Sequence, residues 1–178
     1  MSKSFRIIGC VLLCCALTFF LNACSDQDEA AQAQAKLEAE KLAKMISLVR
    51  QDLDQIQTAA LKFKAEKGED AAHNRAMVEY LEVWPAPPAE LRDATFSFEW
   101  NYFINGTIGD MGGPTNAQDT VVFLEGVKKD ACIEYNHTVN SSNDKIWDFE
   151  GKTERPAADS WCENGGNPYR IIQVVSLN

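Results

Sequence analysis

The sequence contains only two histidines, His73 and His137, and it lacks the motifs by which catalytic sites are usually recognised. It has no HExxH zinc-protease motif, no GxSxG nucleophile elbow and no phosphate-binding P-loop. His73 lies in a polar segment and His137 follows Asn136, so we expect both to have surface or structural roles. Because an enzyme needs positioned acids, bases, nucleophiles or metal ligands, the sequence predicts a protein that is not an enzyme.

Positive charge is also scarce. The chain has 17 Lys and Arg against 26 Asp and Glu, which gives a formal net charge of −9. Contacts to phosphate groups need Lys and Arg, so this balance argues against nucleic acid as a partner. It argues equally against a polybasic dock on anionic lipid.

The apolar run near the start, Ile7 to Leu21, is too short for a permanent membrane span, which needs about 20 apolar residues. It follows Lys3 and Arg6, and this order of a charged and then an apolar region is typical of a secretory signal. We therefore expect residues 1–23 to be a signal peptide. Loss of its two positive charges takes the net charge from −9 to −11.

The signal ends in Leu21-Asn22-Ala23-Cys24, which resembles a bacterial lipobox. In bacterial lipoproteins with a lipobox, the signal peptidase cleaves before the cysteine, and the cysteine thiol then carries diacylglycerol. Leu21, Ala23 and Cys24 fit the pattern, whereas Asn22 departs from it. A plain cleaved signal and an uncleaved anchor are the alternatives. The resemblance implies a lipid anchor at Cys24, and a domain that faces the periplasm or the cell surface. Ser25, rather than aspartate, follows Cys24, which slightly favours the outer membrane.

Cysteine is nearly absent from the mature chain. Of six cysteines, three leave with the signal, Cys24 is the expected lipid site, and Cys132 and Cys162 remain. Two cysteines in an exported chain favour one disulfide over a metal site or a redox pair. Their spacing is not that of a CxxC motif, and two thiols alone do not complete a zinc shell.

Residues 24–36 form a polar, Ala/Gln-rich spacer without a core-facing stripe. From residue 37 onward, apolar residues recur mostly three and four positions apart, and no glycine or proline intervenes before Gly68. This pattern predicts an amphipathic helix from about Asp28 to Lys67. We expect its stripe to pack on a sheet, with coiled-coil pairing as the rival use. The members of the stripe are Leu37, Leu42, Met45, Ile46, Val49, Leu53, Ile56, Ala60 and Phe63.

The remainder of the chain predicts shorter elements. We expect a second helix over 71–81, a strand over 95–104 and another over 119–124 that Gly126 ends. A short helix is expected within 127–140 and a last strand over 169–175. One long helix followed by an antiparallel sheet is an α+β arrangement.

The order of four motifs resembles the globular domain of type IV pilins and type II secretion pseudopilins. These motifs are the helix that ends before Gly68, the aromatic-proline pair Trp84-Pro85, the VVFLEGVKKDACIEYN stretch of 121–136, and Ser160-Trp161-Cys162 with its following strand. The resemblance covers residues 37–178. It implies a pilin-like α+β fold, in which a long amphipathic helix packs on a small antiparallel sheet, and a C-terminal disulfide loop closed by Cys132 and Cys162.

The departure from that family concerns the N-terminus. A pilin precursor has a glycine before its cleavage site, followed by an apolar helix with a glutamate at its fifth position, and neither is present. A lipobox and a polar spacer take their place, so polymerisation into a filament is in doubt. The resemblance therefore implies a lipid-anchored envelope protein that contacts pilus or secretion proteins.

A calcium site is the main alternative to a purely protein-binding role. The expected disulfide loop between Cys132 and Cys162 is rich in side chains that carry oxygen, and calcium prefers oxygen ligands. Some pseudopilins bind calcium in the corresponding loop. The spacing of an EF-hand is absent, so a solvated acidic loop is the other reading. We take Asp144, Asp148 and Asp159 as the candidate metal ligands, and a periplasmic binding module for calcium, a glycan or another ligand as the alternative function. The oxygen-bearing residues of the expected disulfide loop are Asn143, Asp144, Asp148, Glu150 and Asp159.

Overall fold

The chain divides into two compact units, Met1–Lys41 and Leu42–Asn178. A computed structural model gives the coordinates, and each unit is described by itself. The structure describes residues 4–71, 73–77, 79–105, 120–139, 147–148, 159–164 and 169–176.

The first helix, α1, runs over Ser4–Lys67. The predicted end is confirmed: the chain leaves the helix at Gly68, whose φ of 75° is a conformation that favours glycine, and Gly68 N–H donates to Lys64 O at 2.9 Å. The predicted start near Asp28 is wrong. The backbone is helical from Ser4 onward. The Ala/Gln-rich spacer consists largely of strong helix formers, so it continues the helix instead of starting it.

In the first unit, the spacer side chains from Glu29 to Lys41 are all exposed. Gln34 donates to Glu38 at 2.9 Å, and Lys36 lies 4.0 Å from Glu40. Such exposed pairs contribute only a few tenths of a kcal/mol (~0.2–0.5) each. Leu37, the predicted first member of the stripe, is 63% exposed, so this part of α1 has no buried face.

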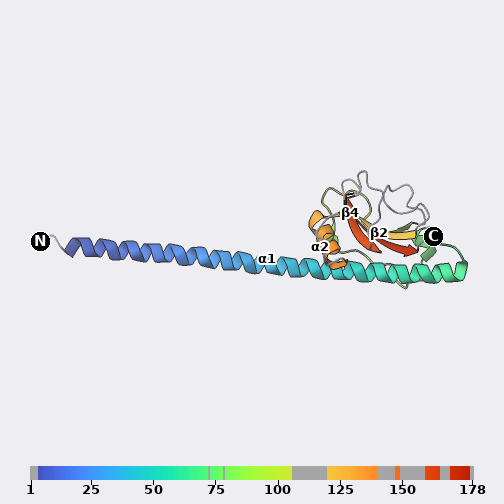
Figure 1. Ribbon diagram of the computed structural model, residues 1–178, viewed down its shortest axis with the longest axis horizontal. Helices are drawn as coiled ribbons and strands as arrows, with labels where there is room; N and C mark the ends of the chain where they lie inside the picture. Colours follow the sequence, from blue (N-terminus) through green and yellow to red (C-terminus); the bar gives the residue numbers. More distant parts are fainter. Residues whose placement is uncertain are drawn as a thin grey trace. The chain divides into compact units, whose positions relative to one another are not determined.

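In the second unit, α1 packs against one face of a sheet (Figure 1). The stripe begins with Leu42 and Met45, which are partly buried, and continues through fully buried residues. Packing on a sheet, rather than coiled-coil pairing, is therefore the use that this stripe has. Its buried members are Ile46, Val49, Leu53, Ile56, Ala59, Ala60 and Phe63.

The sheet has the strand order β1-β2-β5-β4-β3. Four of its strands are antiparallel neighbours, and the two-residue strand β3 pairs in parallel with β4 at the edge. The bounds are β1 Tyr102–Asn105, β2 Thr120–Val127, α2 Lys129–Val139, β3 Trp147–Asp148, β4 Ser160–Asn164 and β5 Tyr169–Ser176. The α+β class, the expected helix within 127–140 and the last strand are thus confirmed.

Two expected elements differ from the structure, and one strand was missed. Over 71–81, the described residues form a 3-10 turn, η1 (Asn74–Met77), followed by a turn in which Tyr80 N–H donates to Met77 O at 2.9 Å. The strand expected over 95–104 is shorter, because the chain first forms a second 3-10 turn, η2 (Ala89–Leu91), and an irregular segment that packs by its aromatic rings. Strand β4 was not predicted at all.

Gly126 does not end its strand, as the sequence suggested. It lies within β2 at a shift of register with a φ of 86°, and the strand continues to Val127. A Cβ on this residue would lie 2.3 Å from Cδ1 of Phe96. Glycine is therefore required at position 126 for two reasons: the register shift is a β-bulge whose backbone has a positive φ, and the Phe96 ring lies too close for a side chain.

The open edge of β1 is closed by one side chain. Asn74 Nδ2 donates to Tyr102 O at 2.8 Å, and Ile104 N–H donates to Asn74 Oδ1 at 2.9 Å. The Asn74 amide thus occupies the position that a neighbouring strand would take. Such capping makes an edge a poor template for pairing with another chain.

Polar contacts join α1 to β5 across the apolar interface. Gln57 Nε2 donates to Val174 O at 2.8 Å, and Gln173 Nε2 donates to Gln57 Oε1 at 2.7 Å and to Asp54 Oδ1 at 3.0 Å. These directional bonds fix the position of the helix along the strand, which apolar contacts alone do not do.

Candidate functional site

The predicted disulfide is present. Cys132 of α2 and Cys162 of β4 are bonded, with their Cα atoms 5.3 Å apart, and both residues are fully buried. A bond between the helix and a strand that lie 30 residues apart in sequence ties α2 to the sheet. Its burial keeps it away from solvent thiols, so its role is structural.

Asn136 reinforces the same connection one turn later on α2. Its Nδ2 donates to Cys162 O at 2.8 Å, and its Oδ1 accepts from Cys162 N–H at 2.6 Å. The side chain is 2% exposed, so both bonds lie in the interior. Cys132 and Asn136 are four residues apart and therefore share one face of α2.

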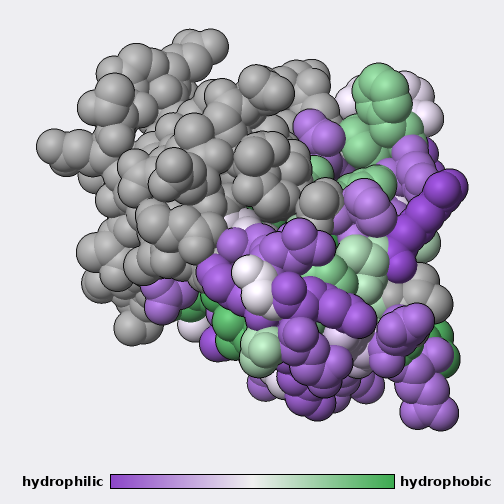
Figure 2. Space-filling view, turned by 90° about the vertical axis from the view of Figure 1, so that its right-hand side faces the viewer, coloured by the Kyte–Doolittle hydropathy of each residue, from purple (hydrophilic) through white to green (hydrophobic). Residues whose placement is uncertain are grey.

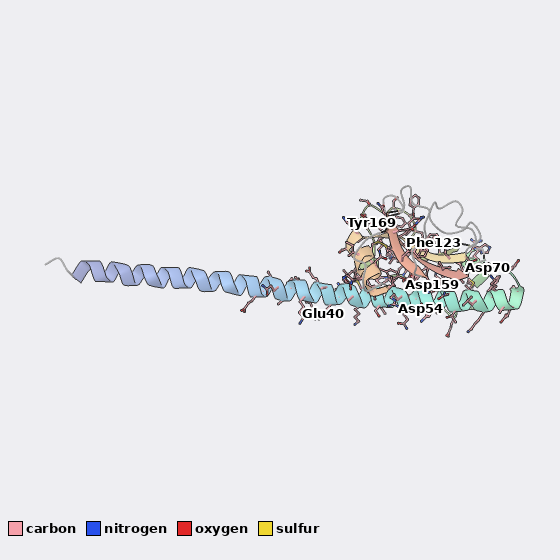
Figure 3. All side chains as sticks on the ribbon, viewed as in Figure 1. Glu40, Asp54, Asp70, Phe123, Asp159 and Tyr169 are labelled. Atoms are coloured by element: carbon pink, nitrogen blue, oxygen red, sulfur yellow. A yellow bond between two sulfur atoms is a disulfide. The ribbon has the colours of Figure 1, made fainter. Side chains whose placement is uncertain are left out.

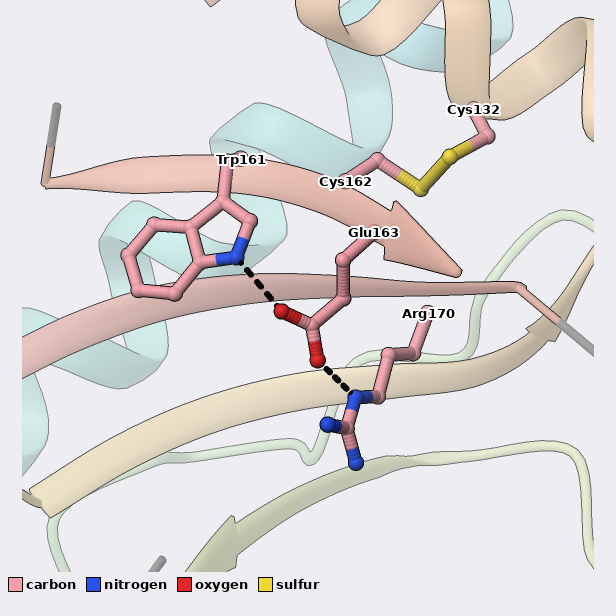
Figure 4. A network of polar contacts seen from close by, with 5 residues as sticks. All are labelled: Cys132, Trp161, Cys162, Glu163 and Arg170. Atoms are coloured by element: carbon pink, nitrogen blue, oxygen red, sulfur yellow. Dashed lines mark hydrogen bonds and ion pairs between the residues drawn. A yellow bond between two sulfur atoms is a disulfide. The ribbon is translucent and has the colours of Figure 1, made fainter. Parts of the chain in front are cut away.

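On the opposite face of β4, Trp161 and Glu163 point away from the disulfide (Figure 4). Trp161 Nε1 donates to Glu163 Oε2 at 2.9 Å, and Arg170 Nε of β5 donates to Glu163 Oε1. Glu163 is 1% and Arg170 5% exposed. Burial raises the pKa of Glu163, and its contacts with Arg170 and Trp161 oppose that rise. This buried ion pair was missed, because a period-two pattern in SWCEN is too short to be read as a strand.

Two buried phenols line the helix side of the sheet. Tyr102 donates to Asp52 Oδ2 of α1 at 2.9 Å, and the hydroxyl of Tyr135 is hydrogen-bonded to Ser160. Burial raises the pKa of both phenols and also that of Asp52. Both phenols therefore stay protonated and serve as structural hydrogen-bond partners.

Of the three candidate calcium ligands, Asp159 alone has a described side chain, which is exposed directly before β4 (Figure 3). Asp144 lies outside the described residues, and for Asp148 the structure describes the backbone, which belongs to the short edge strand β3. The described residues contain no group of three or more His, Cys, Asp or Glu side chains placed to hold a metal. Calcium binding stays a prediction.

Cys24, the expected lipid site, lies within the helical backbone of α1 in the first unit. No described helix combines the length and the apolar character that a membrane crossing requires.

Both histidines are exposed, as expected. His73 Nδ1 accepts from Ala76 N–H at 3.3 Å at the start of η1, and His137 lies in the last turn of α2. Neither belongs to a described arrangement that resembles a catalytic dyad.

An open groove of about 730 Å³ follows α1 in the second unit. Hydroxyl, amide and charged side chains of both signs line it, so it offers many hydrogen bonds and no concentrated charge. We call it the α1 groove. Its lining residues are Ser47, Arg50, Gln51, Asp54, Gln55, Thr58, Ala59, Lys62, Tyr80, Leu81, Glu82 and Thr138.

The surface at the C-terminal end of α1 is mostly hydrophilic, with smaller hydrophobic areas between (Figure 2). No protein-family model, no curated protein and no solved structure matches the chain.

Proposed function

We propose that the chain is a non-enzymatic, lipid-anchored protein of the bacterial cell envelope that acts through contacts with other proteins. By its resemblance to pilins and pseudopilins, it serves a type IV pilus or a type II secretion-like apparatus. The supporting observation is the body of the second unit: one long helix on a four-strand antiparallel sheet, with Cys132–Cys162 tying α2 to it. The order of these elements is that of the family the sequence resembles.

The lipidated cysteine and the spacer fit this role. After cleavage at Cys24, the chain continues as a polar helix whose side chains from Glu29 to Lys41 are all exposed. At about 1.5 Å per residue, these positions extend for roughly 20 Å. A polar helix of this length is a suitable stalk between acyl chains in a membrane and a folded body.

The exposed side of α1 favours an accessory role over a place within a filament. A filament subunit buries an apolar helix against its neighbours, whereas the outward positions of α1 in the second unit are mostly polar. Leu48 and Leu61 are the large apolar exceptions, and each is 45% exposed. Two isolated leucines do not form a continuous apolar face.

Replacement of the anchor cysteine tests the membrane part of the proposal. Cys24→Ala should leave the membrane fraction, because without acyl chains no buried methylenes hold the protein, each worth ~0.8 kcal/mol. Fractionation with immunoblotting measures this, and Cys132→Ala/Cys162→Ala is the matched control that should stay in the membrane. A Cys24→Ala protein that is processed normally and remains there would contradict the lipid anchor.

Gene deletion tests the apparatus part. We expect loss of the gene to lower pilus-dependent motility or type II secretion, and the wild-type gene, but not Cys24→Ala, to restore it. If both phenotypes are unchanged in the deletion strain, the link to these systems is wrong.

The α1 groove supports a second candidate function, binding of a glycan, whose hydroxyls would pair with its amide and hydroxyl side chains. The calcium version of this function depends on Asp144, Asp148 and Asp159 instead. Isothermal titration with calcium, followed by thermal unfolding with and without it, separates the metal from the glycan version. Absence of both heat and stabilisation would exclude the calcium version.

A further inference from the structure

A small aromatic pocket lies beside strands β1 and β2, separate from the disulfide. Its volume is about 310 Å³. Strand residues supply one part of its wall, and the irregular segment before β1 supplies the other. The residues that line it are Phe96, Phe98, Glu99, Phe103, Phe123 and Glu125.

The strand side of the pocket follows from the register of the sheet. Phe103 of β1 is paired with Phe123 of β2 (labelled in Figure 3), and their rings are stacked with centroids 5.6 Å apart. Glu125 lies two residues after Phe123 on the same strand, so its side chain leaves from the same face. Two aromatic rings and a carboxylate thus share one face of two neighbouring strands.

The loop side is fixed by contacts with the bulge in β2. The Phe96 ring lies against Gly126, where no side chain would fit. Arg92 Nη2 donates to Phe96 O at 2.7 Å and to Phe98 O at 3.1 Å, and these bonds hold the segment in place. Phe98 packs on Phe96 with ring centroids 5.8 Å apart, so it has a defined position despite its exposure.

Phe98 is the unusual member, because its side chain is 73% exposed. It is the phenylalanine of the pocket that is mostly open to water, since Phe96 is buried and Phe103 and Phe123 are partly buried. The face of an aromatic ring attracts a cation. Arg92 already lies 5.8 Å from the Phe96 ring centroid, so the same attraction is in use within the protein.

Two carboxylates line the pocket, of which Glu99 is exposed and Glu125 is half-buried. Two arginines lie nearby: Arg170 is the cross-strand partner of Glu125 and pairs with Glu163, and Arg92 lies over the Phe96 ring and donates to Phe96 O and Phe98 O. The mature chain carries a net charge of −11, which disfavours a second copy of the same acidic protein as the occupant. An aromatic wall with two carboxylates suits the planar guanidinium of arginine, which stacks on rings and also pairs with carboxylates.

We propose that this pocket binds an arginine side chain of a partner protein. The inference rests on the proposed function, since it names the surface through which the protein contacts others. The guanidinium lies between the phenylalanine rings, with Glu99 and Glu125 as its hydrogen-bond acceptors. Asn101 Nδ2 donates to Glu99 Oε1 at 3.3 Å and orients that carboxylate.

A titration of the mature lipoprotein in detergent with N-acetyl-arginine amide tests the pocket directly. We expect saturable NMR shifts that are centred on Phe98, Glu99 and Glu125. The citrulline analogue, which has the same shape without the charge, should bind at least tenfold more weakly. Equal binding of the two probes, or shifts spread over the whole surface, would overturn the proposal.

Two variants complete the test. Glu99→Gln/Glu125→Gln should weaken arginine binding at least tenfold and leave the fold unchanged, whereas Glu79→Gln, an exposed carboxylate outside the pocket, should have no effect. Unchanged binding in the double variant would refute the assignment.

A photoreactive phenylalanine at position 98 then tests the proposal in cells. The crosslinked peptide of the partner should contain an arginine within two residues of the attachment site, and capture should fall in Glu99→Gln/Glu125→Gln. Capture of apparatus proteins only by crosslinkers placed elsewhere would reject the pocket and leave the proposed function standing. Arginine-dependent capture of proteins that belong to no pilus or secretion apparatus would support the arginine pocket and contradict the proposed function.

Discussion

Removal of the Cys132–Cys162 bond provides the sharpest test of how this fold is held together. The two residues are 30 positions apart and fully buried. In the chain-entropy model, opening a loop of this length in the unfolded state costs about 3–4 kcal/mol of stability. For a chain of this size, that loss corresponds to a fall in Tm of roughly 10 °C.

The variant is Cys132→Ala/Cys162→Ala in residues 24–178, with Cys24→Ser so that no other thiol takes part in the measurement. Urea unfolding followed by circular dichroism gives the free energy of unfolding. Wild-type protein reduced with a thiol under denaturing conditions and then refolded is the control, and it should behave like the double variant. Coincident unfolding curves for oxidised and reduced protein would refute the reasoning.

Asn136 deepens this prediction, because it joins the same helix to the same strand. With the disulfide intact, Asn136→Ala leaves the buried N–H and C=O of Cys162 without their partners, and we expect a loss of about 2–4 kcal/mol. The two perturbations should not add, because either one alone loosens α2 from β4. Strict additivity in the double-mutant cycle would show that the two connections act independently.

Three further changes have defined outcomes. Gly126→Ala should cost at least about 2 kcal/mol in urea unfolding, because φ is 86° and the new Cβ meets Phe96, and Gly126→Ala/Phe96→Ala should recover part of the loss; no recovery would remove the steric explanation. The pKa of Glu163 is raised in the folded protein, so the folded protein binds a proton at this residue more readily than the unfolded chain does. The free energy of unfolding of the wild type should therefore fall, relative to that of Glu163→Gln, as pH rises from about 4.5 toward neutral. Parallel pH profiles of the two proteins would contradict this. Asn74→Ala should cost about 1–3 kcal/mol and increase self-association in light scattering, because it uncovers the edge of β1; an unchanged, monomeric variant would contradict the capping role.

Much of the helix and of the core could be predicted from spacing alone. The stripe from Ile46 to Phe63 is buried as expected, because residues three and four apart share one face of a helix. The same reasoning failed for Leu37, where the period continues but no partner surface covers it. Periodicity identifies a face that can be buried, and only the folded chain decides whether it is.

The strands were predicted less well, for physical reasons that can be named. The aromatic alternation before β1 has the period of a strand, yet Phe96 packs on Trp100 and on Gly126 instead of joining the sheet. Strand β4 is only five residues long and carries Glu163, whose burial depends on Arg170 of the neighbouring strand. A partner that comes from another strand gives no local signal.

The candidate sites divide in the same way. The disulfide could be predicted because only two cysteines follow Cys24, whereas the two hydrogen bonds of Asn136 could be recognised only from the position of Cys162. The aromatic pocket combines residues from a loop and two strands, and no spacing in the sequence indicates that Phe98 and Phe123 lie together.

In-cell crosslinking of the tagged protein, followed by mass spectrometry of the captured proteins, tests the central claim most directly. The account predicts reproducible capture of pilus or type II secretion components by the wild-type protein, with loss of that capture in Cys24→Ala. Capture of unrelated envelope proteins or of glycan alone, in repeated experiments, would contradict it and show that this helix-and-sheet body serves as a ligand-binding module.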